Sequence, residues 1–319
     1  MAQIATDISL AKDYLDSEEL VAIPTETVYG LAAKGTSIKA LRKIFKAKGR
    51  PINNPLILHF KDWESVTPFV TRMTDDIGKL ASQFWPGPLT LLLPKSDNVP
   101  DMVTAGSKRV AVRVPNHPIT LELLKTLDYP LAAPSANPSG YISPTHPEHV
   151  EAQLGERIPL ILDGGACTSG IESTILGWEN GTPIIYRKGV VTPEDIGRVL
   201  GKQPQFKGKS LVLEAPGMMS SHYAPDTKTI ITENPKETVK GHRNKRMGLL
   251  TFKESTGLEV EKEIVLAQQG SLKEMAKNLY AAMHELDSLG LQVIIIEKAP
   301  DKGIGKAIND RLIRSSTAP

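Results

Sequence analysis

The stretch that decides the fold is residues 44–60, IFKAKGRPINNPLILHF, in which the end of a helix, a rigid turn and a buried strand follow one another. Ser37 can cap this helix, and its apolar residues from Ile38 to Phe45 recur every three or four positions. Gly49 and Pro51 end it, since glycine favours helix C-termini and proline cannot continue a helix. The apolar run 56–60 then predicts a strand.

The rest of the first two thirds of the chain alternates short strands and helices in the same way. Val110, Val112 and Val114 share one face of a period-two strand, which places Arg113 on the other face. The predicted strands are 20–23, 56–60, 89–93, 110–114, 160–162, 174–176 and 183–186, with helices over 7–15, from 37 to the Gly49 turn, and 192–200. We expect residues 1–204 to form an α/β domain.

Residues 205–227 lack a long periodic element and are interpreted as a connector. Beyond them a cleaner pattern of alternating strands and helices begins, which predicts a second, small parallel α/β domain over residues 228–319. Its predicted strands are 229–232, 247–252, 264–267 and 293–297, and its principal predicted helices are 271–289 and 304–314.

Composition and charge narrow the class of protein. The 319 residues carry 38 Lys and Arg against 36 Asp and Glu, so a net charge of +2 gives no global attraction to nucleic acid or membrane. A single cysteine, Cys167, excludes an intrachain disulfide and a multi-cysteine metal site. The sequence shows no signal-peptide pattern and no apolar run of membrane-spanning length, so we expect a cytoplasmic protein without a membrane partner.

Several common catalytic motifs are missing from the sequence. It contains no phosphate-binding G-x-x-x-x-G-K-[ST] loop, no G-x-S-x-G elbow and no H-E-x-x-H zinc motif. His146 and His149 flank Pro147-Glu148, and this pair is interpreted as the start of a helix rather than as a metal site.

The turn after the first long helix is a candidate phosphate site. Lys48 and Arg50 are held by Gly49 and Pro51 beside Asn54, which would preorganise two cations for phosphate oxygens. A solvated turn is an equally valid interpretation of these residues alone. The earlier cations of the same helix, including Arg42 and Lys46, are interpreted as a solvated face.

Four further blocks place small, hydroxyl or cationic residues where strands end. They are PTETVYGLAA (24–33), LAAPSANPSGYIS (131–143), LDGGACTSGIESTIL (162–176) and IIYRKG (184–189). Each block alone could be an ordinary strand-to-loop junction. Together with the cationic turn they indicate binding of a small polar ligand and a polyphosphate, with catalysis by positioning.

In this order and spacing, the five blocks resemble the Sua5/YrdC/YciO family. The combination of KGRPxxNPL, PSAN, ESTI and a later HYAP is specific. The resemblance implies a YrdC-like twisted mixed open sheet with helices over the first part of the chain. It also implies a connector with the signature APGMMSSHYAPDT (215–227) and a small Rossmann-like Sua5 domain, and so covers nearly the whole chain.

The resemblance implies an ATP-dependent nucleotidyltransferase. The family condenses L-threonine, bicarbonate and ATP to L-threonylcarbamoyladenylate and pyrophosphate, for modification of adenosine 37 in tRNAs that read ANN codons. A tRNA threonylcarbamoyl transferase complex would receive the product, so contact with tRNA is not required. Mg²⁺ would be held through the ATP phosphates rather than by a protein metal site.

The resemblance also implies roles for particular residues. Lys48 and Arg50 would act in catalysis, and Tyr223 of the connector would fold over the site as part of a lid. The implied ATP-binding residues are Lys48, Arg50, Asn54, Ser135, Asn137, Ser143, Arg187 and Tyr223. The implied L-threonine-binding residues are Thr27, His59, Arg113 and Ser173.

The chain departs from the family pattern at Ile52, where serine is frequent, and at Arg109, where threonine is frequent. The change at Ile52 puts a serine contact with phosphate in question, and Arg109 either adds a cation near the phosphates or removes a hydroxyl contact. The alternative function is an RNA-binding or ribosome-maturation module without catalysis, in which the basic helix and turn bind RNA. Steep weakening of binding with salt would favour that alternative, because RNA binding releases counterions and a closed ATP pocket does not.

Overall fold

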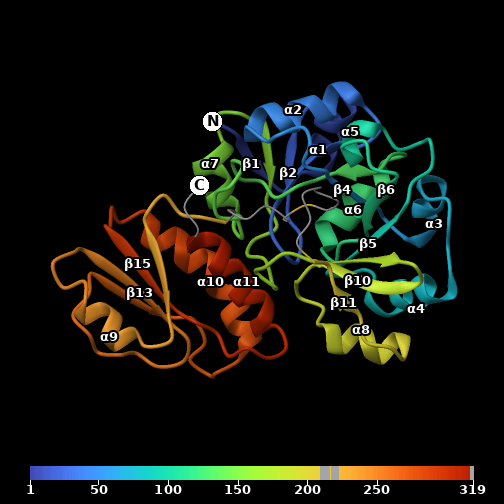
Figure 1. Ribbon diagram of the computed structural model, residues 1–319. Helices are drawn as coiled ribbons and strands as arrows, with labels where there is room; N and C mark the ends of the chain where they lie inside the picture. Colours follow the sequence, from blue (N-terminus) through green and yellow to red (C-terminus); the bar gives the residue numbers. More distant parts are fainter. Residues whose placement is uncertain (209–215, 217–222, 317–319) are drawn as a thin grey trace.

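The computed structural model describes residues 1–208, 216 and 223–316, which form two α/β units (Figure 1). The larger unit contains an eleven-stranded sheet and the smaller one a four-stranded sheet. Of the predicted connector 205–227, residues 209–215 and 217–222 lie outside the described residues. Among the helices of the described ranges, none combines the length and the apolar character needed to cross a bilayer.

The large sheet is mixed, as expected. Strand β4 pairs in parallel with β6, whereas β5 pairs with β6 in the antiparallel sense and with β9 in parallel. In spatial order its strands are β1 (Gln3–Ala5), β8 (Leu160–Leu162), β2 (Val21–Ile23), β3 (Gly30–Lys34), β7 (Leu131–Ala132), β4 (Ile57–His59), β6 (Arg109–Arg113), β5 (Leu89–Pro94), β9 (Thr174–Glu179), β10 (Thr182–Arg187) and β11 (Gln205–Phe206).

The helices of the large unit begin and end where local signals place them. In α2, the Ser37 side chain accepts a hydrogen bond from the Ala40 N–H, and Gly49 ends the helix with a φ of 62°. The helices are α1 (Ile8–Asp16), α2 (Ile38–Lys48), α3 (Trp63–Val66), the 3₁₀ helix η1 (Thr67–Phe69), α4 (Asp75–Phe84), α5 (Asp101–Thr104), α6 (Pro118–Thr126), α7 (Pro147–Leu154) and α8 (Pro193–Leu200). Helix α7 starts directly after His146, as the sequence predicts.

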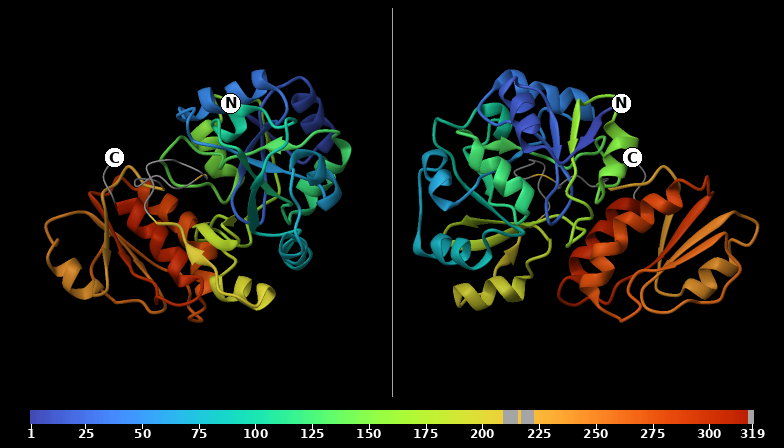
Figure 2. Two further views of the ribbon diagram at one scale, coloured as in Figure 1. Left: turned by 45° about the vertical axis from the view of Figure 1, so that its right-hand side comes forward. Right: turned by 180° about the vertical axis from the view of Figure 1, so that it is seen from behind.

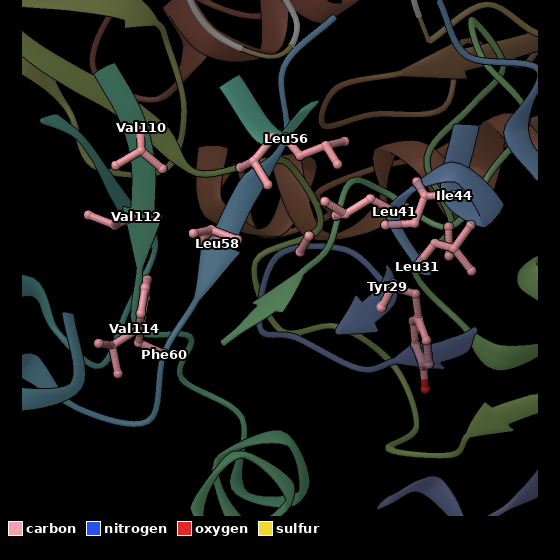
Figure 3. Close-up of a cluster of buried hydrophobic side chains, with 14 of the residues drawn as sticks. Tyr29, Leu31, Leu41, Ile44, Leu56, Leu58, Phe60, Val110, Val112 and Val114 are labelled. Atoms are coloured by element: carbon pink, nitrogen blue, oxygen red, sulfur yellow. The ribbon is translucent and has the colours of Figure 1, made fainter. Parts of the chain in front are cut away.

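The core of the large unit lies between the sheet and helices such as α2. Val110, Val112 and Val114 of one strand lie at one side of this hydrophobic cluster and Leu41 and Ile44 of α2 at the other, with Leu58 of β4 between them (Figure 3). Arg113 lies on the opposite face of that strand, as the alternation predicts. Burying one face of β6 therefore directs its arginine toward the site described below.

The small unit is a parallel α/β sheet, as predicted. Its strands lie in the order β12 (Thr229–Thr232), β15 (Val293–Glu297), β13 (Met247–Thr251) and β14 (Lys262–Val265), and every pair is parallel. Its helices are α9 (Pro235–Lys240), α10 (Leu272–Asp287) and α11 (Gly305–Ser316). Helices α10 and α11 lie between the small sheet and the large unit in all three views (Figures 1 and 2).

One hydrophobic cluster crosses from the small unit to the large one. Val28, Ile142 and Ile171 of the large unit pack with residues of α10 and α11, among them Leu279 and Ile308. The two units are therefore joined by apolar packing, which holds α10 and α11 beside the polar strand ends of the large sheet.

Candidate functional site

The candidate site lies where several strands of the large sheet end together. His59 closes β4 and Arg113 closes β6, and these two residues are register partners in parallel strands. Since β5 runs antiparallel to β6 and parallel to β9, Ser173 immediately before β9 reaches the same edge. Arg187 at the end of β10 pairs with Ile175 beside it.

A cavity at this edge gathers most of the predicted site residues. Thr27, His59, Arg113 and Ser173 line it together with Arg50, Ser135, Arg187 and Tyr223. Lys48, Asn54, Asn137 and Ser143 are buried and are absent from that lining. Lys48, Asn54 and Ser143 instead contact residues that line the cavity, and Asn137 accepts a hydrogen bond from Lys48.

The TETVYG turn after β2 is fixed by its own hydroxyl groups. Thr25 Oγ1 donates to the Val28 carbonyl over 2.6 Å and lies 2.8 Å from Thr27 Oγ1. Arg113 Nη1 donates to Thr27 Oγ1 at 3.1 Å. The turn therefore holds the Thr27 hydroxyl against the guanidinium at the end of β6.

Arg113 also forms a buried ion pair with Glu26. Arg113 Nη2 lies 2.7 Å from Glu26 Oε2, and both side chains are almost completely buried. The sequence shows a carboxylate between Thr25 and Thr27 but not that it is buried, and Glu26 was not among the predicted site residues. The arginine expected to pair with a substrate carboxylate thus has a protein carboxylate beside it.

Arg50 is positioned by the turn that follows α2. Its Nη2 donates to Asn54 Oδ1 at 2.6 Å and to the Pro55 carbonyl at 2.8 Å. Burial lowers the pKa of Arg50 to about 10, so the guanidinium stays charged at neutral pH. The predicted support of Arg50 by Asn54 is a direct hydrogen bond in the structure.

Lys48 faces the turn that contains PSAN rather than the cavity. Its Nζ donates to the Ser135 carbonyl at 2.6 Å and to the Asn137 carbonyl, while its own carbonyl accepts from the Ser139 N–H at 2.8 Å. Burial lowers the pKa of Lys48 well below its ordinary value, and the nearby charge of Arg50 lowers it further. Lys48 therefore ties the end of α2 to this turn.

Ser173 and Arg187 form a second anchored pair. Arg187 Nη2 donates to Ser173 Oγ at 3.0 Å, and Arg187 Nε donates to the Ser173 carbonyl at 3.1 Å. Ser173 Oγ also lies 2.8 Å from Thr90 Oγ1 of β5. Gly189 permits this approach, because a Cβ there would lie 2.4 Å from the Ser173 carbonyl carbon.

Ser143 contacts a residue of the cavity wall, and Asn137 fixes the turn that precedes Ser143. Ser143 Oγ donates to Glu172 Oε1 at 2.7 Å, and Asn137 Nδ2 donates to the Tyr141 carbonyl at 2.8 Å. Glu172 itself lines the cavity. Glu172 was not predicted as a site residue, since ESTI showed only a polar residue before a strand.

The titratable groups of the site do not form an activated nucleophile. Burial, with the charge of Arg113 as the second cause, lowers the pKa of His59 to about 3, so its imidazole is neutral. Burial raises the pKa of Cys167 to about 12, which keeps it a packed thiol. Within the described ranges, no group of three His, Cys, Asp or Glu side chains could hold a metal ion.

The cavity is therefore built to bind anions. Arg50, Arg113 and Arg187 present guanidinium groups to it, and Thr27 and Ser173 add hydroxyl groups. Buried guanidiniums held by protein acceptors are suited to phosphate and carboxylate oxygens, because little reorganisation is needed on binding.

Comparison with known protein families gives two matches that together span most of the chain. Residues 13–189 match the Sua5/YciO/YrdC family profile, described as "Telomere recombination". Residues 191–317 match the profile described as "Threonylcarbamoyl-AMP synthase, C-terminal domain".

Individual relatives match over almost their whole length. The threonylcarbamoyl-AMP synthase of Pyrococcus abyssi is 39% identical over 321 residues, covering 97% of this chain and 94% of that protein. The Bacillus subtilis protein of the same name is 39% identical over 320 residues, covering 97% and 92%. The crystal structure of P. abyssi Sua5 complexed with L-threonine has a TM-score of 0.91 at 35% identity, covering 99% of this chain and 97% of that one.

Proposed function

The chain belongs to the Sua5/YciO/YrdC family, and from this premise we propose that it condenses L-threonine, bicarbonate and ATP into L-threonylcarbamoyladenylate. It is thus a threonylcarbamoyl-AMP synthase, an ATP-using nucleotidyltransferase. The observation that carries this conclusion is the cavity in which three guanidinium groups converge with hydroxyl groups, among them those of Thr27 and Ser173, and in which the described residues include no activated nucleophile.

The reaction has two steps that need positioning more than protein chemistry. The amine of threonine captures bicarbonate to give an N-carboxy group, with loss of water. The new carboxylate oxygen then attacks the α-phosphorus of ATP, and pyrophosphate leaves. Both reactants of the second step are anions, so preorganised cations lower its barrier.

We assign the L-threonine subsite to Thr27, His59, Arg113 and Ser173. All four line the cavity, and His59 and Arg113 are adjacent in register. A neutral imidazole beside a guanidinium can donate or accept a hydrogen bond without adding charge. The proposed role of Arg113 is to pair with the threonine carboxylate while Glu26 holds the other edge of its guanidinium.

We assign ATP to the Arg50 side of the cavity. Arg50, Ser135, Arg187 and Tyr223 line the cavity and would contact the nucleotide directly. Lys48, Asn54, Asn137 and Ser143 would complete this subsite, with contacts that position Arg50, the PSAN turn and Glu172. Tyr223 would cover the nucleotide from the connector.

Mg²⁺ would enter with ATP rather than bind to a protein site. Glu172, which lines the cavity, and Glu26, which precedes the lining residue Thr27, are each engaged by an arginine. When bound, the ion would offset charge on the triphosphate as pyrophosphate leaves. We further propose that a tRNA threonylcarbamoyl transferase consumes the product.

We propose a separate role for each of three segments of the chain. Residues 1–204 would form the catalytic domain, 205–227 the connector that covers the site, and 228–319 the Sua5 domain. The small sheet starts at β12 (Thr229–Thr232), close to the proposed start of the Sua5 domain, whereas β11 (Gln205–Phe206) extends the large sheet by two residues into the proposed connector.

Pyrophosphate release from ATP by the purified full chain tests the function. We expect release that requires both L-threonine and bicarbonate, and a threonylcarbamoyl-AMP product by mass spectrometry. Absence of release with all substrates and Mg²⁺ present would contradict the synthase function. Salt-sensitive RNA binding in that case would support the non-catalytic alternative.

A further inference from the structure

A buried carboxylate links the candidate site to the small unit. Glu172 is 5% exposed and lines the cavity, yet its carboxylate is bound largely from outside it. Arg311 Nε of α11 donates to Glu172 Oε2 at 2.7 Å, and Tyr280 Oη of α10 donates to the carboxylate at 3.1 Å. Ser143 supplies the third donor. Two of the three donors therefore come from the small unit.

Arg311 reaches the neighbours of two proposed substrate contacts. Its Nη2 donates to the Lys188 carbonyl at 2.6 Å, next to Arg187 in the chain. Its Nε holds Glu172, next to Ser173. The Arg311 side chain is 1% exposed, so this fork is fixed in the interior. One guanidinium thus holds the two chain segments from which Ser173 and Arg187 project.

The same guanidinium packs against the connector. It lies 5.1 Å from the centre of the Tyr223 ring, and the Tyr223 and Tyr280 rings stack with centres 5.9 Å apart. Tyr223 lines the cavity. A cation over an aromatic face in a buried position contributes a favourable contact that fixes the ring.

We propose that Arg311 is a positioning residue of the synthesis reaction, through which the small unit completes the substrate site. It neutralises Glu172 at the wall of the cavity, aligns Ser173 and Arg187, and seats Tyr223. This inference rests on the proposed function, because its readout is the synthesis of threonylcarbamoyl-AMP.

The charge of Glu172 makes the proposal specific. The groups that face Glu172 are Arg311, Tyr280, Ser143, Tyr223 and Arg187, with Asp310 behind Arg311. Without Arg311, a carboxylate at the wall of the cavity would repel ATP and the threonine carboxylate. Removal of the carboxylate as well should relieve this repulsion.

The experiment compares Arg311→Met with Arg311→Met/Glu172→Gln in the full chain. Arg314→Met is the matched control, since Arg314 pairs with Asp310 on the same helix, 3.0 Å away. We expect Arg311→Met to raise the KM for ATP about tenfold or more, and the double variant to recover most of that loss. Arg314→Met should keep the wild-type KM.

The pH profile provides a readout that a purely structural role would not move. Burial without the compensating arginine raises the pKa of a carboxyl group, so acidification would neutralise Glu172 in Arg311→Met. The KM for ATP of this variant should therefore fall as the pH is lowered from neutral, relative to wild type, and that of the double variant should not.

Each outcome supports or overturns the proposal. An unchanged KM in Arg311→Met, or an equal loss in the double variant, would overturn it while wild-type synthesis leaves the proposed function intact. If Arg311→Met fails to fold, Tyr280→Phe removes one donor to Glu172 and keeps the ring. A raised KM in Tyr280→Phe supports the proposal, and an unchanged one contradicts it.

Discussion

At the scale of single residues, every guanidinium of the site already has protein acceptors. Arg50 is held by Asn54 and Pro55, Arg113 by Glu26, and Arg187 by Ser173. This anchoring fixes the direction of each cation before substrate binds, which is the requirement for electrostatic catalysis without a nucleophile.

Arg50→Ala tests the phosphate contact. We expect kcat/KM for ATP to fall by about 100-fold or more, because a preorganised cation beside the transferring phosphate is lost. The control is Arg42→Ala on an exposed part of α2, which should keep wild-type pyrophosphate release. Retained activity in Arg50→Ala would contradict the assigned ATP subsite.

Lys48→Met separates support of the turn from direct contact with substrate. It removes the donors to the Ser135 and Asn137 carbonyls, so the free energy of unfolding should fall by about 2–4 kcal/mol, together with activity. The exposed Lys46→Met should change it by less than about 0.5 kcal/mol in the same urea titration. Lost activity with unchanged stability would show that Lys48 acts on substrate alone.

At the scale of elements, the site is a meeting of strand ends. Strands β4 and β6 end at His59 and Arg113, which are partners in register. The segment before β9 lies beside the end of β10, which brings Ser173 close to Arg187. The distance between Ser173 and Arg187 therefore depends on how closely the backbone after β10 approaches the backbone before β9. Gly189 permits this close approach.

Gly189→Val should separate the two strand ends. Its Cβ would meet the Ser173 carbonyl carbon and the Thr174 nitrogen at 2.4 Å, so Arg187 must shift. We expect a loss of about 1–3 kcal/mol of stability and a raised KM for threonine. Gly78→Ala in α4 meets no atom within 4 Å and should instead stabilise the chain by about 0.5–1 kcal/mol in thermal unfolding.

The sequence predicted those elements that carry a clear period or a cap. Helix α2 from Ser37 to Gly49 and strand β6 are examples, and in both the buried face follows the apolar residues. Strand β3 was not predicted, because Gly30–Lys34 is buried on both faces and has no alternation. Strand β1 spans only three residues, too few for a periodic signal.

Some residues of the site carry no local signal in the sequence, whereas others do. The cations and hydroxyl groups of the cavity occur in short motifs, so their types and spacing are visible in the chain. The Glu172–Arg311 pair joins residues 139 positions apart, and nothing local marks either residue as a partner of the other. Burial of Glu26 likewise depends on packing of distant strands.

At the scale of the whole molecule, the small unit is part of the same packed body as the large one. Apolar residues of both units share a cluster, and a line of histidines crosses the interface. His149 of α7 lies against His284 of α10, with ring centres 4.1 Å apart and ring planes tilted by 31°. Protonation in this contact would place two positive charges side by side.

Acid should therefore destabilise the folded chain before its carboxylates titrate. Burial, then the charges of neighbouring histidines, lowers the pKa of His149 to about 3, and burial lowers that of His284 to about 4. The unfolded chain binds these protons near pH 6.5, so stability is full above that pH and is lost as the pH falls.

We expect the free energy of unfolding to fall by about 2 kcal/mol for each such histidine between about pH 6.5 and pH 4.5. Urea titrations at several pH values measure the slope of this dependence, that is, how steeply the free energy of unfolding changes with pH. His149→Gln should flatten it, even if the variant is less stable at neutral pH. An unchanged slope in His149→Gln would show that the interface histidines do not control acid stability.

The three buried guanidinium groups affect the stability of the protein when no substrate is bound. Like charges in one cavity repel one another, and this repulsion lowers the stability of the ligand-free protein. A bound anion would remove the repulsion. Ligands that bind only the native state stabilise it in proportion to their saturation, by about 2.7 kcal/mol at 100 times Kd. The concentrations of ATP and threonine would thus set the stability of the folded protein, and the protein would unfold more readily when both are scarce.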